Sequence, residues 1–99
     1  MHAVAPRTDV LPDIDHDTLR RLLPPYAVVL HDDDVNDMGY VVRSLQMCVP
    51  GLDEQQAVAI MLEAHLNGRA HVITCPLEQA ELYRDRLESR GLTATIEKA

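Results

Sequence analysis

The chain has 99 residues, 46% of them hydrophobic, and its 16 acidic against 9 basic residues give a formal net charge of −7. This length predicts one domain with a single modest core, and the absence of Phe and Trp leaves that core to Val, Leu, Ile, Met and Ala. The acidic balance argues against a protein that binds nucleic-acid phosphates, which requires clustered Lys and Arg, and no apolar run approaches the roughly 20 residues of a membrane-spanning helix.

The first 25 residues contain four of the six prolines and show no sustained periodicity, which predicts a mostly flexible N-terminal arm, residues 1–25. Within it, "DTLRRLL" is able to form a helical turn or two, capped by Asp17 or Thr18 and stopped by Pro24 and Pro25. The arm is either an inert leader or a segment that becomes ordered on a partner, and the sequence leaves both alternatives open. It lacks the basic-then-apolar order of a secretory signal, so the expected location is the cytoplasm.

A core domain, residues 26–99, is expected to begin with a strand and a helix. "YAVVLH", from Tyr26, is short, apolar and rich in β-branched residues, as in a strand. From Met38 onward the apolar residues follow the i, i+3, i+4, i+7 spacing of an amphipathic helix. Asn36 is the predicted N-cap of this helix, and Asp37 suits its first turn through the helix dipole.

The segment "DEQQAVAIMLEAHLNG" predicts a second helix. Asp53 and Gln56 have the spacing of a capping box at its start, and Asn67 and Gly68 are typical of its end. Its apolar stripe consists of Ala57, Ile60, Met61 and Ala64. "AHVITC" then predicts a second strand.

The remaining segments predict one further helix and one further strand. Pro76 suits the first position of a helix, and "LEQAELYRDRLESRG" directs three side chains inward, those of Ala80, Tyr83 and Leu87. "LTATIEK" alternates apolar and polar residues, as in a half-buried strand. The order β-α-α-β-α-β predicts an α+β fold, a small single domain with a three-stranded antiparallel sheet packed against helices.

The two cysteines, Cys48 and Cys75, lie far apart in the sequence and form no CxxC pair. With no other Cys in the chain, a zinc cage of thiolates is not expected. We expect two reduced, half-buried thiols, although the sequence leaves a single disulfide open.

Three consecutive aspartates, residues 32–34, follow the first strand in "VVLHDDDVNDMGYVV". They could form a solvated connection. A calcium loop is disfavoured because the alternating ligands and the closing Glu are missing. Hydrolysis by paired carboxylates is disfavoured because the chain has no nucleophile elbow, zinc helix or phosphate loop. The last alternative is recognition of a cation, such as a peptide α-ammonium, by oriented carboxylates and a nearby imidazole.

Met61 and His65 lie at i and i+4 on the second predicted helix and therefore share a face. Each has an ordinary explanation alone, because a Met in an apolar stripe is usually core and a lone His is usually structural or exposed. Together with Met38 and Val41 of the preceding helix, they are able to line one pocket with apolar walls and a polar lip. Thioether side chains adapt to several apolar ligands.

Three segments of the chain resemble ClpS, the bacterial adaptor that delivers N-degron proteins to Clp AAA+ proteases: "PPYAVVLHDDDVNDMGYVV", "AVAIMLEAHLNGRA" and "TATIEKA". The resemblance covers residues 24–99 with compatible spacing. It implies a non-enzymatic adaptor without cofactor or metal. The implied partners are proteins or peptides that begin with Leu, Phe, Tyr or Trp, and the N-terminal domain of a ClpA- or ClpC-type unfoldase.

The resemblance also implies a site for the α-amino group of the bound polypeptide. ClpS proteins usually carry Asn-Asp-Asp in the acidic loop, and residues 32–34 match these positions. Asp32 and Asp33 would flank the amine, and His65 of the MLxxH motif would be its hydrogen-bond partner.

The side-chain pocket is implied in the same way, by matching each position to the family pattern. Asn36 falls where the family has Thr, Met38 matches the gating Met, and Val41 matches the pocket Val. Met61 forms a wall, and Leu92 matches the Leu that closes the pocket.

Three departures from the family pattern leave alternatives open. Asp32 replaces Asn, Asn36 replaces Thr, and His31 stands where an apolar residue is usual, which would suit a divergent paralogue with a narrower N-terminal preference. A second alternative is an interaction module that binds no degron, such as one like the C-terminal domain of the ribosomal stalk protein. That module is expected to use a basic and apolar helix face, which is disfavoured here because no Lys precedes Lys98.

Overall fold

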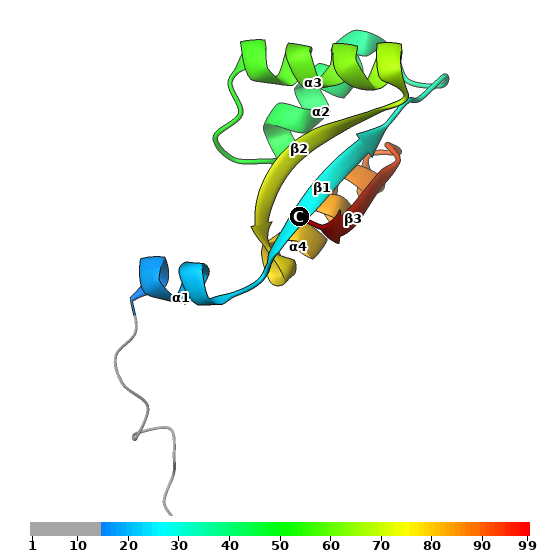
Figure 1. Ribbon diagram of the computed structural model, residues 1–99. Helices are drawn as coiled ribbons and strands as arrows, with labels where there is room; N and C mark the ends of the chain where they lie inside the picture. Colours follow the sequence, from blue (N-terminus) through cyan, green and yellow to red (C-terminus); the bar gives the residue numbers. More distant parts are fainter. Residues whose placement is uncertain (1–14) are drawn as a thin grey trace, which may run out of the picture.

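The computed structural model describes residues 15–99 (Figure 1), so the greater part of the predicted arm lies outside the described residues. The arm's short helix is present as α1, His16–Leu22. The carboxylate of Asp15 accepts a hydrogen bond from the Thr18 backbone N–H at 2.7 Å. The prediction that Asp17 or Thr18 caps the helix is therefore wrong, because both lie inside it and the residue before it provides the cap.

Three strands form one antiparallel sheet, which confirms the predicted α+β fold. They are β1 (Pro25–His31), β2 (Arg69–Pro76) and β3 (Ala94–Lys98), in the order β2-β1-β3. The central strand, β1, begins at Pro25, one residue before the predicted start of the core domain. The division into an arm over residues 1–25 and a core over residues 26–99 stays a prediction.

Helices α2 (Met38–Cys48), α3 (Glu54–Asn67) and α4 (Leu77–Ser89) complete the domain. The capping box of Asp53 and Gln56 is present in α3, which Gly68 ends in the left-handed conformation with φ 91°. Two other predicted boundaries are wrong. Asp37 rather than Asn36 caps α2, accepting from the Tyr40 N–H at 2.8 Å, and Pro76 ends β2 as the N-cap of α4 rather than occupying its first helical position.

The core lies between the helices and one face of the sheet. Val28 and Leu30 of β1 point into it, and they meet Leu45 of α2 and Leu87 of α4, both with no exposed surface. Helix α4 contacts all three strands, whereas α3 contacts β1 and β2, and α2 packs on α3 and α4. Figure 1 shows the consequence: α2 and α3 lie together near the end of β1 where the acidic loop begins.

The opposite face of the sheet carries polar side chains that interact across the strands. Arg69 of β2 forms an ion pair with Glu97 of β3 at 2.7 Å, and His31 is within 2.7 Å of the Thr95 hydroxyl. Val29, between these strands, is only 3% exposed. The ion pair therefore links the two edge strands, β2 and β3, across β1. The Thr95 hydroxyl gives His31 a partner away from the acidic loop.

Candidate binding pocket

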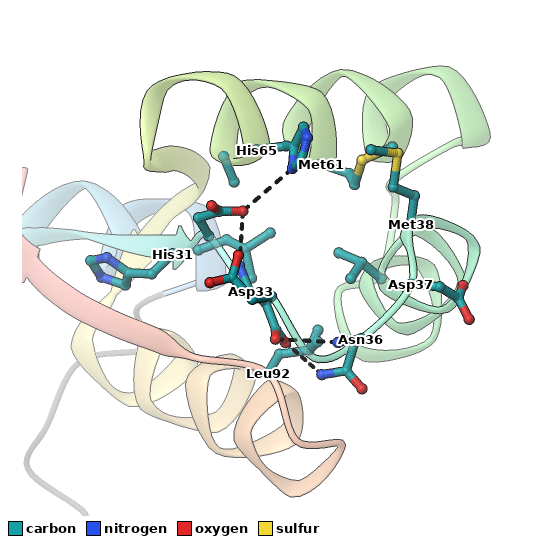
Figure 2. Close-up of a pocket in the computed structure, with 13 residues that line it drawn as sticks. His31, Asp33, Asn36, Asp37, Met38, Met61, His65 and Leu92 are labelled. Carbon is teal, nitrogen blue, oxygen red and sulfur yellow. Dashed lines mark hydrogen bonds and ion pairs between the residues drawn. The ribbon is translucent and has the colours of Figure 1, made fainter.

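A pocket of about 370 Å³ opens where β1 ends, between the loop of residues 32–37, the helices α2 and α3, and the segment before β3. It brings together all the residues that the sequence selected: Asp32, Asp33, Asn36, Met38, Val41, Met61, His65 and Leu92. Five lining residues were not selected as site residues from the sequence, namely Leu30, His31, Asp34, Asp37 and Ala64. Figure 2 shows Asp33, Met38, Met61 and His65 around one hollow.

Asp32 and His65 face each other across the lip of the pocket. The Asp32 Oδ1 and His65 Nδ1 atoms are 3.6 Å apart, with side-chain exposures of 37% and 50%. The same Asp32 oxygen accepts a hydrogen bond from the Asp33 backbone N–H at 2.9 Å. Both side chains therefore keep polar atoms available to solvent, and an ammonium placed between them would find two acceptors when the imidazole is neutral.

Asp33 holds the loop in shape. Its Oδ1 accepts from the Val35 N–H at 2.7 Å and from the Asn36 N–H at 3.3 Å, and its Oδ2 accepts from the Asn36 side-chain amide. These bonds make an Asx-type turn. Since a carboxylate offers about four acceptor positions, Asp33 keeps room for one further donor.

The hydrogen bonds to Asp33 also determine its charge. The Asn36 side-chain amide, followed by the Val35 N–H, holds the pKa of Asp33 below its ordinary value. The carboxylate is therefore ionised throughout the neutral range. Its contribution to the loop is complete above the ordinary aspartate pKa and is lost only as the pH falls through the lowered value in the folded protein.

Asn36 joins the acidic loop to the other side of the pocket. Its side-chain nitrogen donates to the backbone carbonyl of Gly91 at 3.1 Å as well as to Asp33. An amide nitrogen has two N–H groups and serves both acceptors, whereas a Thr hydroxyl has one O–H. The Asn at this position therefore links the loop directly to the residue that precedes Leu92.

Apolar side chains from three separate segments form the floor. Val41 of α2, Met61 of α3 and Leu92 are all buried, whereas Met38, the first residue of α2, is 45% exposed. Figure 2 shows Met38 and Met61 on the same side of the hollow. Met38 is thus the exposed member of an otherwise buried floor.

A second set of contacts holds Arg90, two residues before Leu92, against α2, and the sequence analysis did not identify it. The Tyr40 hydroxyl donates to the backbone carbonyl of Arg90 at 2.7 Å. The Arg90 guanidinium donates to the Ser44 hydroxyl at 2.7 Å and lies 4.9 Å from the centre of the Tyr40 ring. Ser44 on the buried face of α2 was the available signal, because a buried hydroxyl requires a partner.

Some candidates do not contribute a side chain to the pocket. The His31 ring points away from it in Figure 2, toward Thr95.

Within residues 15–99, no group of three or more His, Cys, Asp or Glu side chains is placed to hold a metal ion, and no helix in that range is long and apolar enough to cross a membrane. Cys48 and Cys75 are free, as expected, but buried rather than half-buried, and burial raises the pKa of both thiols.

Comparison with known proteins agrees with this arrangement. Residues 22–95 match the family described as ATP-dependent Clp protease adaptor protein ClpS. The chain is 52% identical over 80 residues to the ATP-dependent Clp protease adapter protein ClpS of Synechococcus elongatus, covering 81% of this chain and 84% of that protein. It is 42% identical over 78 residues to the chloroplastic adapter CLPS1 of Arabidopsis thaliana, covering 79% of this chain and 49% of that protein.

The fold also matches a solved structure, that of Agrobacterium tumefaciens ClpS2 bound to L-phenylalaninamide. The TM-score is 0.73 at 26% sequence identity, with coverage of 77% of this chain and 98% of that chain. The relatives are named as protease adapters, which confirms the predicted adaptor role and the prediction that the protein is not an enzyme. By its sequence match, its fold and its acidic-lipped pocket, the chain belongs to the ClpS family of Clp protease adaptors.

Proposed function

We propose that this adaptor binds the first residue of polypeptides that begin with Leu, Phe, Tyr or Trp. The observation that carries the proposal is one pocket with a carboxylate and imidazole lip above a buried apolar floor. The lip suits an α-ammonium and the floor suits a large apolar side chain. Phenylalaninamide, the molecule bound to the Agrobacterium relative, contains both groups.

In this proposal Asp32, Asp33 and His65 surround the amine, while the side chain enters the hollow between α2 and α3. Discrimination has two parts, because a buried polar group without a partner is costly and an unfilled apolar floor gains no burial energy. A polypeptide with an apolar first residue but a blocked amine satisfies only one part. Neither part alone would separate a degron from other chain ends.

The direct test compares two peptides that differ only in the first residue, one beginning with Leu and its twin beginning with Gly. Fluorescence polarisation should show binding of the first and at least about tenfold weaker binding of the second, because the Leu side chain buries several methylenes. Equal affinities would reject the side-chain pocket. Comparison of Leu, Phe, Tyr and Trp would show whether Asp32 and Asn36 narrow the preference.

We further propose that the adaptor delivers its cargo to the N-terminal domain of a ClpA- or ClpC-type AAA+ unfoldase, in the cytoplasm, with residues 1–25 acting in the transfer. This arm joins the domain at the end of β1 that lies away from the pocket, since α1 precedes Pro25 and the acidic loop follows His31. A chain that starts at Leu23 should bind peptides normally yet fail to promote degradation of a reporter. Full delivery by the shortened chain would make the arm an inert leader.

A further inference from the structure

A second hollow lies beside the binding pocket, in the groove between α2 and α3. Its volume is about 290 Å³. Met38 and Met61 line both hollows, so these two thioethers form the partition between them. Val42 and Val58 extend the apolar floor of the second hollow beyond that partition.

The spacing of the two hollows follows from the residues that α3 contributes to each. The binding pocket takes Met61, Ala64 and His65 from this helix, whereas the second hollow takes Glu54, Val58 and Met61. The centres of the two sets are between five and six residues apart, or about 8 Å at a rise of about 1.5 Å per residue. The second hollow is therefore displaced toward the N-terminus of α3 by roughly one and a half turns.

An extended polypeptide has a matching repeat. Successive side chains point to opposite sides, and alternate ones point to the same side about 6.5–7 Å apart. A chain whose first side chain fills the binding pocket and which continues toward the N-terminus of α3 would present its third side chain, not its second, to the second hollow. The two hollows adjoin, because Met38 and Met61 line both of them.

The chemistry of the second hollow favours an apolar side chain. Its floor consists of aliphatic and thioether groups, while Arg43 and Glu54 at its margin carry opposite charges. Opposite charges on the margin give no net preference for an acidic or basic residue, and the apolar floor gains energy from any methylene that it buries.

We infer that the second hollow receives the third residue of the bound polypeptide and that an apolar side chain there strengthens binding. This inference rests on the proposed function, because it requires the first residue to occupy the binding pocket. It adds a sequence preference beyond the chain terminus, so that two substrates with the same first residue are bound with different affinities.

The test uses the full chain and three peptides of equal length, beginning Leu-Ala-Leu, Leu-Ala-Gly and Leu-Leu-Gly. The first should bind at least about fourfold more tightly than the second, the factor expected for burial of a single methylene. The third peptide should bind like the second, because its added Leu is at the position that points away. Equal affinity of the first two peptides, or an equal gain from Leu at either position, would overturn the inference.

Protein variants then locate the effect. Val58→Ala removes part of the floor of the second hollow and should reduce the ratio between the first two peptides to less than about twofold. Val58→Thr keeps the side-chain size but replaces one methyl group with a hydroxyl, and should also lower the ratio between the first two peptides. This variant serves if Val58→Ala proves too unstable to measure. Leu62→Ala is the matched control, since Leu62 follows one turn later on α3, is 40% exposed and lines neither hollow.

The outcomes separate the inference from the proposed function. If Leu-Ala-Gly binds and the third residue has no influence, the binding pocket stands and the inference fails. If none of the peptides binds, the proposed function fails and the inference fails with it. A ratio that survives both Val58 variants, or that falls equally in Leu62→Ala, would also contradict the inference, because the preference would arise elsewhere.

Discussion

The lip and the floor of the binding pocket are built in different ways. The lip is exposed, and short-range hydrogen bonds hold it, chiefly those from Val35 and Asn36 to Asp33. The floor is buried and draws on three segments that meet only in the folded chain. The lip can therefore lose a charge without unfolding the domain, whereas the floor serves both the fold and the ligand.

The largest expected effect comes from the core that supports the floor. Leu45→Ala should lower the free energy of unfolding by about 2–5 kcal/mol, because a fully buried Leu leaves a cavity. Urea denaturation followed by circular dichroism measures this change. A loss below about 1 kcal/mol would contradict the view that Leu45 is tightly packed where α2 meets α3 and α4.

A change in the lip should affect binding rather than folding. Asp33→Asn keeps an acceptor for the loop but removes the charge that faces the ammonium, which should weaken peptide binding by about 1.5–3 kcal/mol. Asp34→Asn is the matched control, because it removes the same charge from a neighbouring carboxylate that also lines the pocket but makes no hydrogen bond within the described residues. Isothermal titration should show a much smaller loss for Asp34→Asn, and equal losses would indicate a general field rather than a defined contact.

Met38, the exposed residue of the floor, should control which side chains enter. Met38→Ala should admit peptides beginning with Ile or Val, whose branching at Cβ the Met is expected to exclude, with a change of about 1–3 kcal/mol. Met47→Ala is the control, because Met47 is on the same helix and 67% exposed. Failure of both variants to bind Ile-initiated peptides would argue against Met38 as the gate.

The smallest effect should come from the contacts that position Leu92. Tyr40→Phe removes the hydrogen bond to Arg90 but leaves the ring beneath its guanidinium, so binding should weaken by about 0.5–1.5 kcal/mol. Tyr83→Phe on α4 offers a control at another partly buried ring. Unchanged peptide affinity in Tyr40→Phe would show that the hydrogen bond from Tyr40 to Arg90 does not contribute to the position of Leu92 in the pocket.

The same contrast explains what the sequence could predict. Hydrophobic periodicity predicted the helices correctly, because residues such as Val41, Val42 and Leu45 face one core. The MLxxH spacing predicted that Met61 and His65 share one face of a helix. The cap of α2 was misplaced because Asn36 and Asp37 are both good caps, and only the folded chain brings Gly91 close enough to engage Asn36. The links from Arg90 to Tyr40 and Ser44 were missed because they join residues more than forty positions apart.

The central claim is that the lip recognises a free α-ammonium, and acetylation of the peptide N-terminus tests it most directly. The acetyl group removes the charge and presents a carbonyl to the Asp32 and Asp33 carboxylates. Titration of free and acetylated Leu-initiated peptides should show binding of the free peptide only, with a loss of at least about 2–3 kcal/mol on acetylation. Undiminished binding of the acetylated peptide would contradict the account, since the acidic lip would then have no part in recognition.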